Sequence, residues 1–314
     1  MPLDHYVSQV HLKNFYSPKL KCLMYAIRKN DLKSFPTNSD SVCRIESGST
    51  NLYLQDVRAI EGFLKGIEPK YNTAIRKLAE NQIDAECIYV IAGFVAYVLT
   101  CSPAGMRIKS KYLKSMVEEV TQIADKQDLF PAPPPELAGE SLSQLIKDGK
   151  VNVDIDPKYP QAIGINSIMS VTNKFGNFAW EVLINPYSDS PFFTSDFPVT
   201  IEETDDPRIR NRVIPLSPSL AVRIRPDPNF EEEQSRFSFS NFRYLIKKIN
   251  RTQVTNINRQ VVRCAENMVF YRDDNEWIPR FVKKNASFRI ESKIHRIPRG
   301  NGMFLWVSEE IVKI

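Results

Sequence analysis

The run from Ile88 to Leu99 constrains the fold most, because its apolar residues cover every face of a helix. A helix that is apolar all round is buried, either in a protein core or in a bilayer. This run has about 12 residues, whereas a membrane-spanning helix needs about 20. We therefore expect the central buried helix of a globular protein, ending at Ser102-Pro103, and no interaction with a membrane.

Apolar residues spaced three and four apart surround this helix on both sides. They predict helices over 54–65, 69–81, 84–100 and 109–126, after short strands at 23–28 and 42–45 that suit a hairpin. Glu61 and Glu68 would share one helix face, but Gly62, Gly66 and Pro69 weaken the continuity of that helix. We interpret both glutamates as part of a solvated face.

The second half of the chain has a mixed pattern. A strand at 178–184, a turn and a short strand at 192–194 predict a hairpin. Helices are expected at 163–174 and 251–265, and further strands at 212–218, 220–224, 268–271, 277–282 and 303–307. The predicted fold class is α+β, with a helical N-terminal half packed on a mixed, mainly antiparallel sheet that includes a late helix.

A proline-rich stretch at 130–135 is stiff and poor in hydrogen-bond donors, and it separates the two patterns. It predicts an N-terminal region over 1–130 with the first motif, the hairpin and the helices. A proline-rich connector and acidic segment follow over 131–160, and then an α+β region over 161–314. A single compact domain over the whole chain also fits the pattern.

The segment 192–199 places Thr194, Ser195 and Asp196 between apolar residues. Pro198 biases Phe197 away from helix and cannot donate to a ladder, so Asp196 should lie at a strand end. Strand ends often carry functional side chains. The alternative is that Ser195 and Asp196 only bond their own backbone in a turn.

The N-terminal segment 4–15 holds two of the three histidines, His5 and His11. Ser8 can cap a short helix that begins with Gln9, which leaves His5 just outside it. A histidine there can titrate, bond a carboxylate or bind a metal, or it can simply bond a nearby carbonyl. We interpret His11 as packing. Arg107 follows the break at Ser102-Pro103, where it could meet a phosphate or a carboxylate, although a surface role is the default.

The net charge and the cysteines bear on the binding partners and on the cellular compartment. The net charge is +5, and the part from Arg243 onward carries +8 by itself. That part could contact nucleic acid or another phosphate-bearing ligand, or it could be a solvated face. The five cysteines are odd in number and widely spaced, and the first residues show no secretory signal. We therefore expect a reducing compartment and a cytoplasmic protein.

Several blocks of the chain are similar to a known family. They are the segment His5-Tyr6-Val7 with Gln9, Leu12, Asn14 and Phe15, the pairs Ile60-Glu61 and Ile67-Glu68, Ser102-Pro103, Trp180, Thr194-Ser195-Asp196 with Pro198, and Pro215-Leu216-Ser217-Pro218. In these blocks the chain resembles the mostly bacterial family called domain of unknown function 4238. Relatives usually have proline where Ser8 stands and often asparagine where Phe197 stands. The resemblance implies an architecture and a site position, but no reaction.

The common nucleotide-binding, zinc-protease and serine-hydrolase motifs are absent from the sequence. Our first hypothesis is an intracellular hydrolase, with a phosphodiester as one candidate substrate. In it His5 and Asp196 are catalytic, and Gln9, Ser195, Thr194 and Arg107 bind the substrate. Asp196 would orient His5 or hold a divalent metal, so the cofactor stays open. The alternatives are a non-catalytic nucleic-acid or nucleotide binding protein, and a purely structural hydrogen-bond network.

Overall fold

Helix α4 (Ala85–Cys101) forms the centre of the computed structural model, which describes residues 3–133, 135–137, 139–206, 209–227, 237–240, 242–299 and 302–314. The Asp84 side chain caps it by accepting the N–H of Cys87 at 2.8 Å. All residues from Val90 to Val98 are buried. The prediction of a buried central helix is confirmed.

Among the described residues, no single helix is long and apolar enough to cross a bilayer. Only α4 and α5 (Pro103–Lys126) together reach that length and apolar character, and they are bent by 60° at Ser102.

The other helices of the first half are α2 (Ala59–Ile67), the 3₁₀ turn η2 (Glu68–Lys70) and α3 (Tyr71–Ala79). Gly93 of α4 lies against the end of α2. A Cβ atom at position 93 would be 2.3 Å from Cδ1 of Ile67 and 3.3 Å from the ring of Phe63. The missing side chain therefore lets α2 approach α4 closely.

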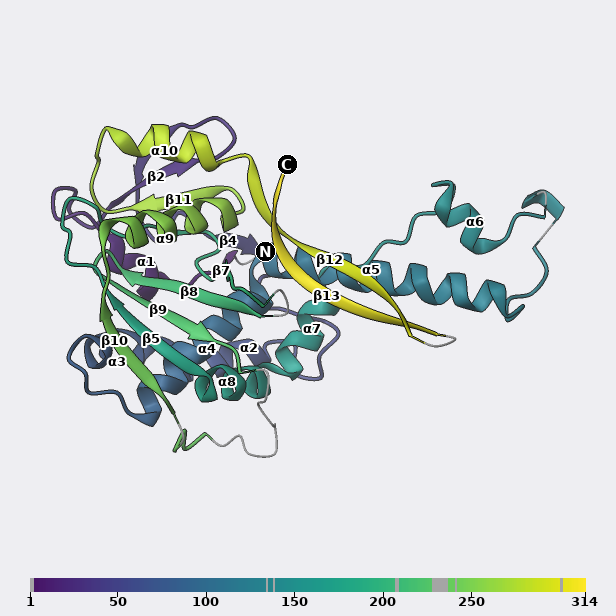
Figure 1. The fold of residues 1–314 in the computed structure, drawn as a ribbon, viewed down its shortest axis with the longest axis horizontal. Helices are drawn as coiled ribbons and strands as arrows, with labels where there is room; N and C mark the ends of the chain where they lie inside the picture. The colour runs from purple at the N-terminus through teal and green to yellow at the C-terminus, as the bar shows by residue number, and fades with distance from the viewer. Residues whose placement is uncertain are drawn as a thin grey trace.

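A five-stranded sheet has the order β10-β5-β9-β8-β7. Only the pair β10–β5 is parallel, so the sheet is mixed and mainly antiparallel, as predicted. Helices α4 and α8 lie behind it in Figure 1, and Trp180, Val182 and Ile224 of the sheet share one hydrophobic cluster with α4. The strands are β5 (Ala179–Ile184), β7 (Thr200–Glu203), β8 (Arg210–Ser217), β9 (Leu220–Arg225) and β10 (Tyr244–Lys248).

The predicted hairpin of 178–184 with 192–194 is wrong. Strand β6 (Thr194–Ser195) belongs to a second sheet of order β3-β2-β11-β6, where it pairs with β11 (Met268–Tyr271). The early hairpin is also different, because β2 (Met24–Arg28) pairs with β3 (Ser34–Thr37), while β4 (Arg44–Glu46) pairs with β1 (Leu3–His5). Strands β6 and β4 therefore pair with distant segments of the chain, whereas β2 pairs with the strand that follows it directly.

The late helix α9 (Arg251–Cys264) is confirmed, and it begins with a capping box between Asn250 and Gln253. The strand expected at 277–282 is instead helix α10 (Trp277–Asn285). Its buried residues Ile278 and Val282 are four apart, which is the helical spacing. The single helix expected at 163–174 is divided near Ser167 into α7 (Lys158–Asn166) and α8 (Ile168–Asn177).

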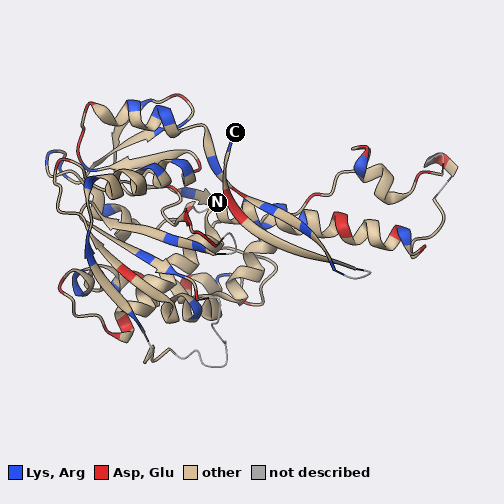
Figure 2. Cartoon of the chain, in the orientation of Figure 1, with Lys and Arg blue, Asp and Glu red and all other residues tan. Residues whose placement is uncertain are grey.

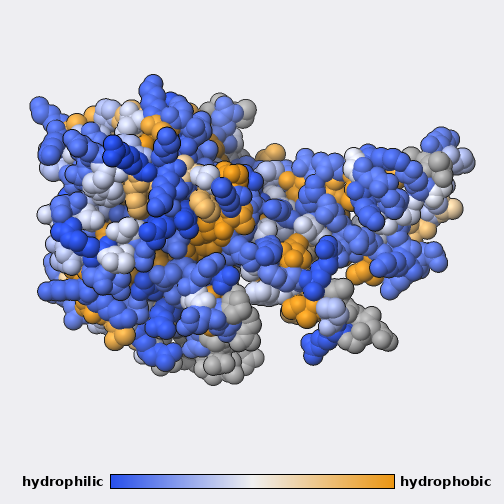
Figure 3. Space-filling view, turned by 45° about the horizontal axis from the view of Figure 1, so that its top comes forward, coloured by the Kyte–Doolittle hydropathy of each residue, from blue (hydrophilic) through white to orange (hydrophobic). Residues whose placement is uncertain are grey.

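An arm projects from the body in Figure 1. It consists of the distal part of α5, the 3₁₀ turn η3 (Pro135–Leu137), α6 (Leu142–Lys147) and a ribbon of β12 (Phe288–Arg299) with β13 (Gly302–Lys313). Figure 3 shows apolar residues at the surface of the arm, and the exposed residues of α5 include Val117, Val120 and Ile123. In the body, one hydrophobic cluster contains residues from both sides of the proline-rich stretch.

Candidate functional site

A pocket of about 380 Å³ lies beside the N-terminal strand. Strand β1, the start of α1 (Gln9–Leu12), the segment after β4, and α2 with η2 form its walls. Its lining residues are Leu3, Asp4, His5, Gln9, Val10, Ser49, Glu61, Leu64, Lys65 and Glu68. The pocket thus brings together two of the predicted site residues, His5 and Gln9, with the two glutamates of the isoleucine-glutamate pairs.

Hydrogen bonds fix the backbone around His5. Strand β1 pairs with β4 in the register His5 to Arg44, and the Tyr97 hydroxyl donates to the carbonyl of His5. The Asp4 carboxylate accepts the N–H of Ser49 at 3.0 Å. Helix α1 begins directly after Ser8, although the Ser8 side chain makes no capping hydrogen bond. The position of His5 is therefore set by its backbone.

The ring nitrogen Nε2 of His5 is buried and has no hydrogen-bond partner among the described residues. A buried polar atom without a partner costs about 1–3 kcal/mol, so such atoms are rare in folded proteins. His5 as a whole is half-buried and lines the pocket. An unpaired nitrogen in this position is typical of a group that contacts a ligand or a water molecule.

Carboxylates dominate the charge of the pocket. Asp4, Glu61 and Glu68 line it, whereas Lys65 is the one cation among the lining residues. Arg58 lies next to them, forming an ion pair with Glu61 and lying 3.9 Å from Asp4. The hydrogen bond from Arg58 lowers the pKa of Glu61, so that carboxylate is ionised at neutral pH.

Gln9 lines the same pocket, and its Oε1 accepts a hydrogen bond from the Ser39 hydroxyl at 3.1 Å. This bond fixes the orientation of the side-chain amide and leaves the NH₂ end as its donor group. Gln9 can therefore offer a donor of fixed direction to a ligand.

Asp196 does not line this pocket. Its carboxylate is buried and accepts the backbone N–H groups of Glu266 at 2.9 Å, Asn267 at 2.7 Å and Met268 at 3.0 Å. Burial raises its pKa to about 6, although these three hydrogen bonds and the charge of Lys29 act in the opposite direction. The carboxylate holds the turn between α9 and β11.

No hydrogen bond between His5 and Asp196 is found among the described residues, and their shared site stays a prediction. Tyr6, the neighbour of His5 in the chain, is affected by the charge of Asp196. Burial raises the pKa of Tyr6 most, and the charges of Cys43, Asp196 and Glu266 add to this effect. Asp196 is thus within electrostatic range of the segment that carries His5.

Ser195 and Thr194 are fully buried. The Ser195 hydroxyl accepts the N–H of Phe197 at 3.1 Å, which is the local turn bond named as the alternative. The Thr194 hydroxyl lies 2.8 Å from Nε2 of His11. In this structure neither side chain lines the pocket that contains His5.

His11 is more than a packing residue. Its Nδ1 lies 2.8 Å from the Tyr71 hydroxyl, and its ring stacks on Phe94 with centroids 4.8 Å apart. Complete burial lowers its pKa to about 3, so the ring is neutral. His11 therefore connects α1, α3 and β6 through hydrogen bonds that are inaccessible to solvent.

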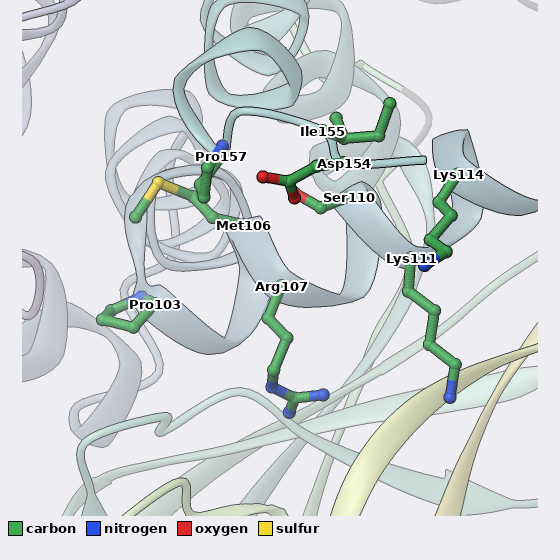
Figure 4. Close-up of a pocket in the computed structure, with 9 residues that line it drawn as sticks. All are labelled: Pro103, Met106, Arg107, Ser110, Lys111, Lys114, Asp154, Ile155 and Pro157. Atoms are coloured by element: carbon green, nitrogen blue, oxygen red, sulfur yellow. The ribbon is translucent and has the colours of Figure 1, made fainter. Parts of the chain in front are cut away.

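Arg107 makes a fork of hydrogen bonds to the carboxylate of Glu266, with both distances at 2.8 Å, and a further one to Glu291 at 2.8 Å. It lines a different pocket of about 440 Å³ between α5 and the segment before α7. Figure 4 shows its guanidinium pointing away from Asp154 on the opposite wall. Arg107 thus donates to the side-chain carboxylate of Glu266, and the Asp196 carboxylate accepts the backbone N–H of the same residue.

No group of three or more His, Cys, Asp or Glu side chains in the described ranges is arranged to hold a metal ion. Glu61 and Glu68 line the pocket, whereas the sequence predicts only a solvated face for them. Their seven-residue spacing is the sequence feature that indicates a shared face. The structure keeps them on one wall because η2 directly continues the chain after Ile67.

Comparison with known proteins gives a family but no function. No curated protein and no solved structure matches the chain. The family model described as "Protein of unknown function (DUF4238)" matches residues 4–275, which include every lining residue of the His5 pocket except Leu3. Since this match covers most of the 314 residues, the chain belongs to the DUF4238 family.

Proposed function

We propose that this protein is a hydrolase that uses acid–base chemistry in the N-terminal pocket, with His5 as the group that transfers protons. The observation that carries the proposal is the buried, unpaired Nε2 of His5 in a pocket lined by carboxylates. Histidine changes its charge near neutral pH and is the side chain most often used for this task.

In the proposed reaction, Nε2 of His5 accepts a proton from a water molecule as that water attacks the substrate. The imidazolium that forms then gives the proton to the leaving group, so the ring returns to its neutral form. Glu61 and Glu68 stabilise the transient positive charge, because a carboxylate nearby favours the protonated ring. The amide of Gln9 positions the substrate. Asp196 supports the fold around this site and does not contact the substrate.

The charges of the pocket favour an uncharged or cationic substrate. Three carboxylates and one lysine line it, and an anionic phosphodiester would be repelled by this surface. A phosphodiester would therefore bind here only together with a divalent cation that offsets its charge. The reaction with phosphodiesters should depend on added Mg²⁺ or Mn²⁺, whereas the reaction with neutral esters or glycosides should not.

The test uses four classes of p-nitrophenyl substrates, namely carboxylic esters, glycosides, phosphate monoesters and phosphate diesters, each with and without Mg²⁺ or Mn²⁺. Release of p-nitrophenolate is measured for the wild type and for His5→Gln and Glu61→Gln. We expect each variant to lose activity by about 100-fold or more. Glu86→Gln changes an exposed carboxylate on α4, outside the pocket, and serves as the control. Full activity in His5→Gln, or no activity with any class, would contradict the proposal.

A further inference from the structure

The β12–β13 ribbon places cations and aromatic rings on one face. Side chains two residues apart in a strand point to the same side, so Lys293, His295, Ile297 and Arg299 share a face of β12. Across the ribbon, Trp306 is opposite His295 and Phe304 is opposite Ile297. The rings of His295 and Trp306 are in contact, with centroids 4.6 Å apart.

This face is open to solvent. Phe304 is 50% exposed and Ile297 is 45% exposed, although they are direct cross-strand neighbours. The side chain of Lys293 is 58% exposed, and Arg299 is also exposed. The ribbon projects from the body alongside α5 in Figure 1. A large aromatic ring left in water on a projecting element indicates a contact surface.

Cations and acids lie in different parts of the ribbon. From Lys293 to Leu305 the sequence contains three lysine or arginine residues and no aspartate or glutamate. The acids lie nearer the body, where Glu291 and Glu309 pair with Arg107 and Arg212. Figure 2 shows the Lys and Arg segments along β12 in blue.

Two of the outer cations have partners within the protein. Lys293 lies 3.2 Å from Glu310, and Arg296 pairs with Glu119 of α5. The Lys293 side chain is 58% exposed and its bond to Glu310 is long, so Lys293 can also contact an anionic ligand, whereas Arg296 lies on the other face of β12 and is not part of the proposed surface. Arg299 has no ion pair in the described part of the chain.

We propose that this face of the ribbon binds single-stranded nucleic acid, with phosphates at Lys293 and Arg299 and bases stacked against Phe304 and the Trp306 side of the ribbon. Single-strand binding proteins combine such cations with aromatic rings, because every unpaired base has a face to stack on. A duplex offers the same phosphates, but its bases already stack on one another. A bilayer would favour a continuous apolar face, whereas cations interrupt this one. The proposal goes beyond the hydrolase function and does not depend on it.

The test measures the fluorescence anisotropy of a labelled oligothymidine of about 20 nucleotides over a range of salt concentrations. We expect Phe304→Ala to weaken binding about 10-fold at every salt concentration, because stacking is lost. The double variant Lys293→Gln with Arg299→Gln should weaken binding and also make the salt dependence shallower by about 1.4 in log–log slope, since two cations are removed. Leu52→Ala and Lys70→Gln change an exposed apolar residue and an exposed lysine elsewhere, and should bind like the wild type.

Three results would overturn the proposal. The first is the absence of oligonucleotide binding at low salt. The second is equal affinity for single strand and duplex together with no effect of Phe304→Ala, which would indicate only a general attraction to phosphate. The third is binding to anionic lipid vesicles without binding to the oligonucleotide. His5→Gln should bind the oligonucleotide like the wild type, so failure of the hydrolase proposal is distinguishable from failure of this one.

Discussion

His5 and His11 lie six residues apart in the chain but in opposite surroundings. The ring of His11 is completely buried, and both of its nitrogens have partners in Tyr71 and Thr194. The ring of His5 lines a pocket, and its Nε2 has no partner in the described structure. The difference separates a residue that stabilises the fold from one that is available for a ligand. A histidine-rich segment therefore does not mark every histidine in it as functional.

The largest expected effect on stability comes from His11→Leu. This change keeps an apolar side chain in the core but leaves the hydroxyls of Tyr71 and Thr194 without their partner. Each buried unpaired group costs about 1–3 kcal/mol, so we expect a loss of about 2–6 kcal/mol in the free energy of unfolding. This loss can be measured by urea denaturation monitored by circular dichroism. A loss below about 1 kcal/mol would show that the two hydroxyls find other partners.

The pH dependence of stability should separate His11 from Asp196, because their pKa shifts have opposite consequences. The pKa of His11 falls from 6.5 to about 3 on folding. The contribution of His11 to the free energy of unfolding is therefore complete above pH 6.5 and is lost as the pH falls below that value. Burial raises the pKa of Asp196 from 3.8 to about 6 on folding, so its contribution is greatest below pH 3.8 and is lost as the pH rises to 6.

Two variants measure these contributions. The stability difference between the wild type and His11→Gln should shrink by up to about 1.4 kcal/mol per pH unit as the solution is acidified from neutral pH. The difference between the wild type and Asp196→Asn should change by a similar amount with the opposite sign between about pH 4 and pH 6. If the free energy of unfolding changes with pH in the same way for the wild type and a variant, the substituted group does not change its protonation on unfolding.

The smallest expected effect on stability belongs to His5→Gln. Its Nε2 makes no hydrogen bond in the described structure, and the backbone of His5 stays held by Tyr97 and β4. We expect a change within about 0.5 kcal/mol in the free energy of unfolding, as for most half-exposed positions. The melting temperatures of the wild type, His5→Gln and His11→Leu, measured under the same conditions, test this prediction. A loss as large as that of His11→Leu would place His5 with the structural residues.

The long helices could be predicted from the sequence because their apolar spacing repeats over many residues, as in α4 and α9. The pairing of β6 could not, since a strand of two residues contains too little pattern and its partner, Phe270, is distant in the chain. In helix α10 the residues Trp277, Ile278 and Phe281 favour a strand by type, whereas the spacing of the buried Ile278 and Val282 is helical.

The candidate site was predictable in part for similar reasons. His5 and Gln9 are close in sequence, and both line the pocket. The hydrogen-bond partners of Asp196 are backbone N–H groups, which every residue except proline has, so no side chain could reveal them. The α-helix ends at Ile67, as the glycines and Pro69 suggest, but η2 continues the chain directly, so Glu61 and Glu68 still line one pocket.

The close approach of α2 to α4 at Gly93 has a consequence for the wall of the pocket. Ile67 rests on that glycine, and Glu68 follows it directly on the pocket wall. A methyl group at position 93 would force either a new rotamer of the Ile67 side chain or a shift of α2 away from α4. The packing behind the pocket wall therefore depends on a residue that does not itself line the pocket.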